Sequence, residues 1–135
     1  MTDTCSTGLP SQERPEPLIR SSTSQPLMKP VFVISRHGDM ADLKIRHPFP
    51  FLTMSPMGAG NSFGVPWWLQ VVGDERSTSI LDCGASAALA RIALLAGIGW
   101  VVCKASPRQL TALSSDETHR GRILTARPQA TPWPR

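Results

Sequence analysis

The apolar residues of this chain are concentrated between residues 31 and 103, which limits what the chain can fold into. Residues 1–30 hold five of the thirteen prolines and many serines and threonines. Such a segment buries too little surface to offset the entropy lost on ordering it, so we predict that it is disordered. Residues 104–135 are similar and rich in arginine, so a basic disordered tail is predicted there. Residues 31–103 remain for one small packed domain.

Short apolar runs indicate the strands of this domain. Two of them, residues 31–34 and 51–54, are separated by a polar stretch, and the second leads into a glycine-rich loop over residues 58–64. Residues 69–72 and 79–83 are also of β type and flank a Gly-Asp pair. Two such runs around a turn predict an antiparallel hairpin.

The stretch from Ala85 to Cys103 is almost continuously apolar and long enough to span a bilayer. Arg91 lies well inside it, however, and would cost about 2.5–3.5 kcal/mol at the centre of a spanning helix. Apolar residues recur at helical spacing up to Ala96, Gly97 is placed to cap a helix, and residues 98–103 are again of β type. A buried helix followed by a buried strand is therefore predicted, which gives an α/β fold with a helix laid on a sheet and makes a membrane location the weaker alternative.

The segment from Phe51 to Ile98 resembles the opening of the metallo-β-lactamase superfamily, especially its ribonuclease Z and phosphodiesterase-like branch. The resemblance rests on the strand before the glycine loop, on the string Leu-Asp-Cys-Gly-Ala-Ser at residues 81–86, and on the helix that follows. It implies a partial metallo-β-lactamase-like layer of strand, glycine loop, hairpin, helix and strand. By position, Asp82 would support a metal site without being a primary ligand, Gly84 would turn the chain from strand into helix, and the loop residues would be Gly58, Gly60 and Asn61. The alternative is that Asp82 only caps the helix beginning near Ala85.

The chain departs from this family where the metal ligands are expected. Members of the family place His-x-His-x-Asp-His after the next strand, which brings several imidazoles and a carboxylate onto zinc. The corresponding position here is near Ser106–Gln109, which holds no histidine, and His119 is the only later one. We therefore predict no catalytic residue and no metal ligand, and expect zinc only if the missing motif were supplied. The predicted function is a truncated metallo-β-lactamase-like hydrolase fragment without independent activity, left by truncation or by a change of reading frame.

A second resemblance is carried by residues 31–39. A strand followed by Arg36-His37-Gly38 is similar to the signature of histidine phosphatases, in which a histidine is the nucleophile and arginines clamp the phosphate. By position His37 would be the nucleophile and Arg36 a clamp. No suitable second histidine is evident, since His47 is too close in sequence, so a charged loop after a strand is the favoured interpretation.

The charge suggests a non-enzymatic alternative. The formal net charge is +4, and much of the excess is carried by the tail. A small basic binding protein could hold an acidic partner or nucleic acid through Arg120, Arg122 and Arg127, although arginines also keep a tail soluble. The three cysteines show no disulfide or zinc-finger spacing, and the N-terminus does not resemble a signal peptide, so a cytoplasmic setting is expected. Cys83 and Cys103 are predicted to be small buried side chains.

Overall fold

The computed structural model describes residues 28–135, so the predicted disorder of residues 1–27 lies outside the described residues. Within these residues the fold is α/β, with a five-stranded parallel sheet and four α-helices. The strands are β1 (Val31–Val33), β2 (Leu52–Met54), β3 (Ser79–Asp82), β4 (Trp100–Val102) and β5 (Ile123–Leu124). The helices are α1 (His37–Arg46), α2 (Ala59–Val72), α3 (Ala87–Leu95) and α4 (Pro107–Ser114), with 3-10 turns η2 (Gly73–Thr78) and η3 (Glu117–His119).

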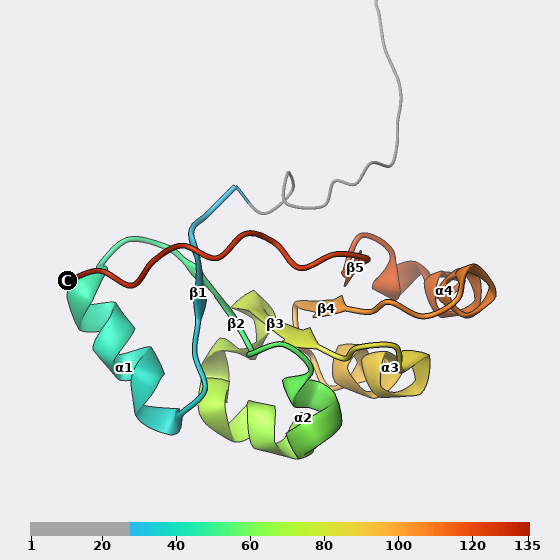
Figure 1. Ribbon diagram of the computed structural model, residues 1–135, viewed down its shortest axis with the longest axis horizontal. Coiled ribbons are helices and arrows are strands. Elements are labelled where there is room, and N and C mark those ends of the chain that lie inside the picture. Colours follow the sequence, from blue (N-terminus) through green and yellow to red (C-terminus); the bar gives the residue numbers. More distant parts are fainter. Residues whose placement is uncertain (1–27) are drawn as a thin grey trace, which may run out of the picture.

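The strands stand in the sheet in the order in which they occur in the sequence, β1-β2-β3-β4-β5. Every neighbouring pair is parallel, for example Val31 beside Leu52 and Ile80 beside Trp100. Parallel crossovers are almost always right-handed, so a sheet that always advances in one direction carries its helices on one face. Figure 1 shows α1, α2 and α3 on one side of the sheet, with α4 beside α3.

Alternate residues of the strands point to opposite faces and build two clusters of buried side chains. The larger cluster lies between the sheet and the helices, where Phe32, Leu81 and Val101 meet residues such as Trp68 of α2. The smaller cluster lies on the other face and consists of Val31, Leu52, Met54, Ile80, Val102 and Leu124. Burial on both faces explains why the strands read as continuous apolar runs and not as alternating ones.

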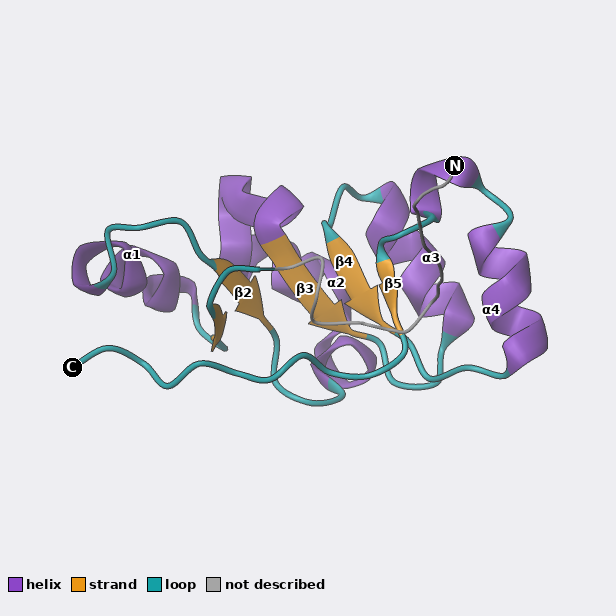
Figure 2. Cartoon of the chain, turned by 90° about the horizontal axis from the view of Figure 1, so that it is seen from above, coloured by secondary structure: helices purple, strands orange, loops and turns teal. Residues whose placement is uncertain are grey.

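The C-terminal segment, residues 125–135, runs from β5 across the sheet to β1 on the side away from α1–α3 (Figures 1 and 2). At its far end the backbone N–H of Thr131 donates to the Val31 carbonyl (2.7 Å) and the Trp133 indole N–H donates to the Val33 carbonyl (2.9 Å). These bonds use polar groups that edge strand β1 would otherwise leave open. Because residues 104–135 also form α4, η3 and β5, the prediction of a disordered tail is wrong.

The predicted hairpin is also wrong. Residues 69–72 belong to α2 and not to a strand, and the loop predicted over residues 58–64 is largely the beginning of the same helix. The helix is interrupted at Gly64 (φ +88°), and Pro66 stands in the first turn after this kink, where a proline needs no N–H partner. The parallel order of the strands therefore replaces the strand, loop, hairpin, helix and strand that the family resemblance implied.

Several predicted elements are confirmed. The runs over residues 31–34, 51–54 and 79–83 contain β1, β2 and β3. The apolar stretch from Ala85 to Cys103 forms α3 and β4, and Gly97 takes a positive φ of +94° directly after the helix. Among residues 28–135, none of the helices combines the length and the apolar character needed to cross a membrane.

Candidate functional site

Asp82 lies at the carboxyl end of β3 and is paired with Arg127 of the same chain. Asp82 is almost fully buried, and its Oδ2 accepts a hydrogen bond from Arg127 Nη1 at 2.8 Å, while Oδ1 accepts from the Gly84 backbone N–H at 2.9 Å. The same Arg127 nitrogen donates to the Ser55 carbonyl at the end of β2 (3.1 Å). A carboxylate that is paired with a guanidinium and hydrogen-bonded can remain buried without a metal ion.

The glycine loop packs directly against this strand end. A Cβ added to Gly60 would lie 2.7 Å from the Asp82 carbonyl oxygen, and one added to Gly84 would lie 2.6 Å from Asn61 Oδ1. Gly58 has a positive φ (+68°) and precedes the first residue of α2. The structure thus places Gly60, Asn61, Asp82 and Gly84 close together. Gly58 precedes Gly60 by two residues. The contact is tight packing between the start of α2 and the turn before α3.

Arg36 and His37 lie elsewhere, at the start of α1. The predicted charged loop is the beginning of a helix, in which Asp39 Oδ2 accepts from the backbone N–H groups of Ser35 (2.9 Å) and Arg36 (3.0 Å). The imidazole Nδ1 of His37 is 2.9 Å from the Gln70 carbonyl oxygen, and Arg36 is exposed. These contacts attach α1 to α2 and fix the first turn of the helix.

The three histidines are distributed over different parts of the fold. His37 begins α1 and His47 follows its end, so about 15 Å of helix separates them. His119 is buried in η3, beyond α4. Within the described part of the chain, no three side chains of histidine, cysteine, aspartate or glutamate gather as a metal site would require.

The two cysteines of the domain are buried thiols behind the strand ends. Burial, with smaller contributions from Cys103 and Asp82, raises the pKa of the Cys83 thiol to about 12. Burial also raises the pKa of Cys103. A thiol with a raised pKa is a poor nucleophile near neutral pH, so the surroundings of Cys83 and Cys103 disfavour the thiolate form that covalent chemistry needs. The prediction of small buried side chains is confirmed.

The arginines assigned to a binding tail make contacts within the chain. Arg122 donates through three nitrogens to four carbonyl oxygens, including those of Ile98 (2.6 Å) and Gly99 (3.1 Å). Arg127 is bound to Asp82, and Arg120 Nε donates to the Ser114 carbonyl oxygen (3.2 Å). Guanidinium groups tied to carbonyl oxygens in this way have fewer N–H donors left for phosphate.

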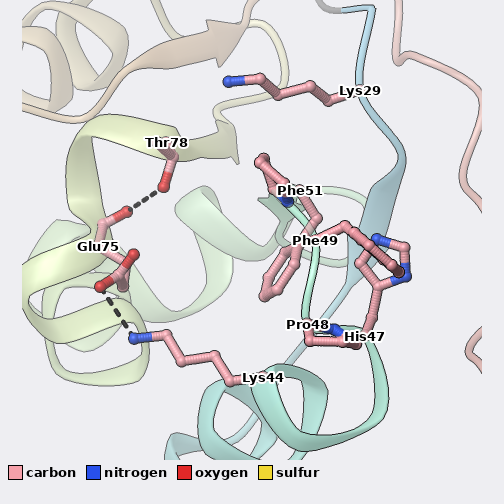
Figure 3. A pocket seen from close by; sticks show the side chains of 9 residues that line it. Lys29, Lys44, His47, Pro48, Phe49, Phe51, Glu75 and Thr78 are labelled. Carbon is pink, nitrogen blue, oxygen red and sulfur yellow. Dashed lines mark hydrogen bonds and ion pairs between the residues drawn. The ribbon is translucent and has the colours of Figure 1, made fainter.

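An open groove of about 460 Å³ lies at the opposite, amino end of the sheet (Figure 3). It is lined by residues preceding β1, β2 and β3 and by the end of α1: Lys29, Lys44, His47, Pro48, Phe49, Pro50, Phe51, Glu75 and Thr78. Figure 3 shows Phe49 and Phe51 on one side, Glu75 and Thr78 on the other, and the two lysines at the two ends. Lys44 Nζ is bound to Glu75 Oε2 at 3.0 Å. The volume of the groove lies in the range of small-ligand sites.

The aromatic side of the groove is built from edge-on ring contacts around His47. His47 packs edge-on against Phe32, Phe49 and Phe51, with ring centroids 5.2, 5.7 and 5.8 Å apart. Phe51 also meets Phe32 edge to face at 5.6 Å. Phe32 is buried, whereas Phe49 is 68% exposed. Packing therefore orients a large apolar ring that water still reaches, and this ring can receive a ligand.

Sequence reasoning missed this groove, because its residues come from four separate stretches of sequence. The available signal was His47-Pro48-Phe49-Pro50-Phe51, in which two prolines stiffen a short segment with two exposed or half-buried rings. Comparison with protein-family models, with curated proteins and with solved structures finds no match for this chain.

Proposed function

We propose that this chain is a small-ligand-binding module whose site is the groove of Figure 3. The ligand class that fits is a planar apolar ring system carrying one anionic group, such as an aromatic carboxylate. The observation that carries the proposal is an exposed Phe49 ring facing a groove with a lysine at each end. A concave, partly apolar site with a few placed charges is the usual form of a small-molecule site.

The charges of the groove favour an anion at one end. Lys44 is neutralised by Glu75, at 3.0 Å, and this carboxylate faces the groove from η2. Lys29 adds a second positive charge at the other end, so the charged groups of the lining sum to a net positive charge. An anionic group is expected near Lys29, because the Glu75 carboxylate would repel it at the Lys44 end.

The apolar part of the ligand is expected to lie along Phe49 and Phe51. Offset or edge-on aromatic contacts contribute about 0.5–1.5 kcal/mol beyond the buried area. Pro48 and Pro50 fix the backbone φ at two positions on either side of Phe49, which reduces the ordering entropy lost on binding. The groove thus supplies an apolar surface and a lysine charge at one end.

The proposal is tested by isothermal titration calorimetry of the full chain with 2-naphthoate, with the uncharged 2-naphthalenemethanol as a comparison. We expect saturable binding of 2-naphthoate, weakened about tenfold by Phe49→Ala and severalfold by Lys29→Gln. The alcohol should bind more weakly and should not respond to Lys29→Gln.

Lys104→Gln is the matched control, since Lys104 is an exposed lysine that follows β4 at the other end of the sheet. It should leave the affinity unchanged within about twofold. The proposal fails if 2-naphthoate does not bind, or if Phe49→Ala and Lys104→Gln alter its affinity equally.

The truncated metallo-β-lactamase-like hydrolase fragment remains a second proposal. One observation favours it: Asp82 stands at the carboxyl end of the central strand, and Gly84 (φ +58°) then turns the chain toward α3. Ligands of parallel α/β sheets bind at such strand ends. Zinc analysis with a panel of ester and phosphodiester substrates tests it: the fragment alone should show no turnover, whereas stoichiometric zinc with turnover would replace the inactive fragment by an active metal-dependent hydrolase.

A further inference from the structure

A second, smaller cavity of about 300 Å³ lies on the far side of the fold, beside α3 and between α4 and η3. It is lined by Arg91 of α3, by Ala112, Leu113 and Ser115, and by Asp116 and His119. It shares no residue with the groove of Figure 3.

His119 faces this cavity with an unused acceptor. Its side chain is only 3% exposed, and Nδ1 lies 3.3 Å from the Leu113 carbonyl oxygen. A carbonyl oxygen only accepts, so Nδ1 carries a hydrogen, and in the singly protonated ring Nε2 then carries a lone pair. Among the residues that the structure describes, Nε2 has no hydrogen-bond partner. A buried acceptor without a partner is costly and calls for a group that completes it.

Asp116 presents a second acceptor next to it. Its Oδ1 accepts from the Thr118 backbone N–H (2.9 Å) and from the Thr118 hydroxyl (2.7 Å). These hydrogen bonds, with smaller contributions from the charges of His119 and Arg91, hold the pKa of Asp116 below its usual value. Oδ2 lies 3.8 Å from His119 Nε2. A single donor atom can sit between two acceptors at this separation, about 2.9 Å from each.

Arg91 determines which kind of donor fits. A bare cation between Asp116 and His119 would be repelled by the guanidinium on the same cavity wall, and a bare anion beside Arg91 would be repelled by Asp116. A molecule that carries both charges meets neither penalty. A guanidinium can bind a carboxylate through two parallel hydrogen bonds.

We propose that this cavity binds a small zwitterion of the free α-amino acid class. The ammonium group donates to His119 Nε2 and Asp116 Oδ2, and the carboxylate pairs with Arg91. The proposal is independent of the groove, because the two sites are formed by different elements and the ligands differ in charge.

The test uses the full chain and glycine, followed by NMR of the imidazole ring signals of His37, His47 and His119. We expect saturable shifts of the His119 signals alone. Asp116→Asn should weaken glycine at least tenfold and Arg91→Gln about fivefold. Because both residues are largely exposed, their substitution should leave the fold intact, which the unchanged His37 and His47 signals would show. Arg108→Gln, an exposed arginine of α4, is the matched control and should change the affinity less than twofold.

Separate titrations with methylamine, acetate and zinc chloride complete the test. Methylamine and acetate each offer half of the proposed ligand and should bind at least tenfold more weakly than glycine. The proposal is overturned if glycine produces no saturable shift, which would leave a bridging water as the partner of Nε2. It is also overturned if methylamine binds as tightly as glycine, or if zinc binds at His119 and depends on Asp116, which would make the cavity a metal site.

Discussion

The two ends of the sheet differ in how their charged groups are satisfied. At the carboxyl end, Asp82 is buried and bound to Arg127, which the C-terminal segment brings across the sheet. At the amino end, the ring of Phe49 is exposed and two lysines border an open groove. The charged groups at the carboxyl end are paired within the chain, whereas the amino end leaves a surface that a ligand can cover.

This difference shows that position in a fold does not alone define a site. The carboxyl end of a parallel sheet is where α/β proteins usually bind ligands. Here the pairing of Asp82 with Arg127 and the close contact of Gly60 with the Asp82 backbone fill that position.

The largest effect is expected from Arg127→Met. The variant leaves the Asp82 carboxylate buried without its partner, and breaking a buried pair costs about 3–5 kcal/mol, with the lower end expected because Arg127 is 19% exposed. Urea unfolding of the full chain measures the loss. The double variant Asp82→Asn with Arg127→Met should lose less, since it leaves no unpaired charge.

Arg108→Gln is the control for this prediction, and its cost should stay below about 0.5 kcal/mol. If Arg127→Met behaves like Arg108→Gln, then Asp82 is not held by Arg127 and the carboxyl end of the sheet is open to ligands.

Gly60→Ala should have the next largest effect. An added Cβ would lie 2.7 Å from the Asp82 carbonyl oxygen and 3.3 Å from the side chains of Leu81 and Leu89, so overpacking should cost about 1–3 kcal/mol. Gly38→Ala in α1 is the matched control, because no atom lies within 4 Å of its added Cβ. That substitution should stabilise the helix by up to about 1 kcal/mol. Equal thermal shifts of the two variants would contradict tight packing at the carboxyl end.

A smaller effect is expected from alkaline pH. Burial raises the pKa of Cys83 from 9.0 to about 12, so above pH 9 the thiol ionises in the unfolded chain while it stays protonated in the folded one. The unfolded state then binds fewer protons, and the free energy of unfolding should fall as pH rises from about 9 to about 12. Urea unfolding over this range should show a shallower decline for Cys83→Ala. An identical decline in both chains would mean that the thiol is not buried.

The smallest effect on stability is expected at the amino end. Phe49→Ala and Lys29→Gln replace exposed side chains, so each should change the free energy of unfolding by less than about 0.5 kcal/mol. The same variants should nevertheless weaken 2-naphthoate, as proposed above. A loss of stability comparable to that of Gly60→Ala would assign Phe49 to the core instead of the ligand surface.

Much of the fold could be predicted where local pattern and tertiary context agree. Ala85 to Cys103 contains both the helical repeat and the cap glycine of α3, and these signals are local. Residues 69–72 were misassigned because a short continuous apolar run fits a buried helix as well as a strand. The tail was misassigned although Ser106-Pro107 and Gln109 form a capping box with proline at the first turn, a signal that does predict α4.

The sites were harder to predict than the fold. Asp82, Gly84 and the glycine loop could be placed near one another from sequence, but their partner Arg127 is 45 residues away, and no local pattern links it to Asp82. The groove depends on Lys29 before β1, Lys44 of α1, Phe49 before β2 and Glu75 of η2 coming together. Only the strand order of the sheet brings them together.

The most direct test of this account is an NMR map of backbone amide shifts as 2-naphthoate is added to the full chain. The account predicts saturable shifts within residues 44–51 and 75–78, and unchanged signals for Ser55, Asp82 and Gly84. Shifts concentrated around Asp82 and Gly84, with none near Phe49, would contradict it.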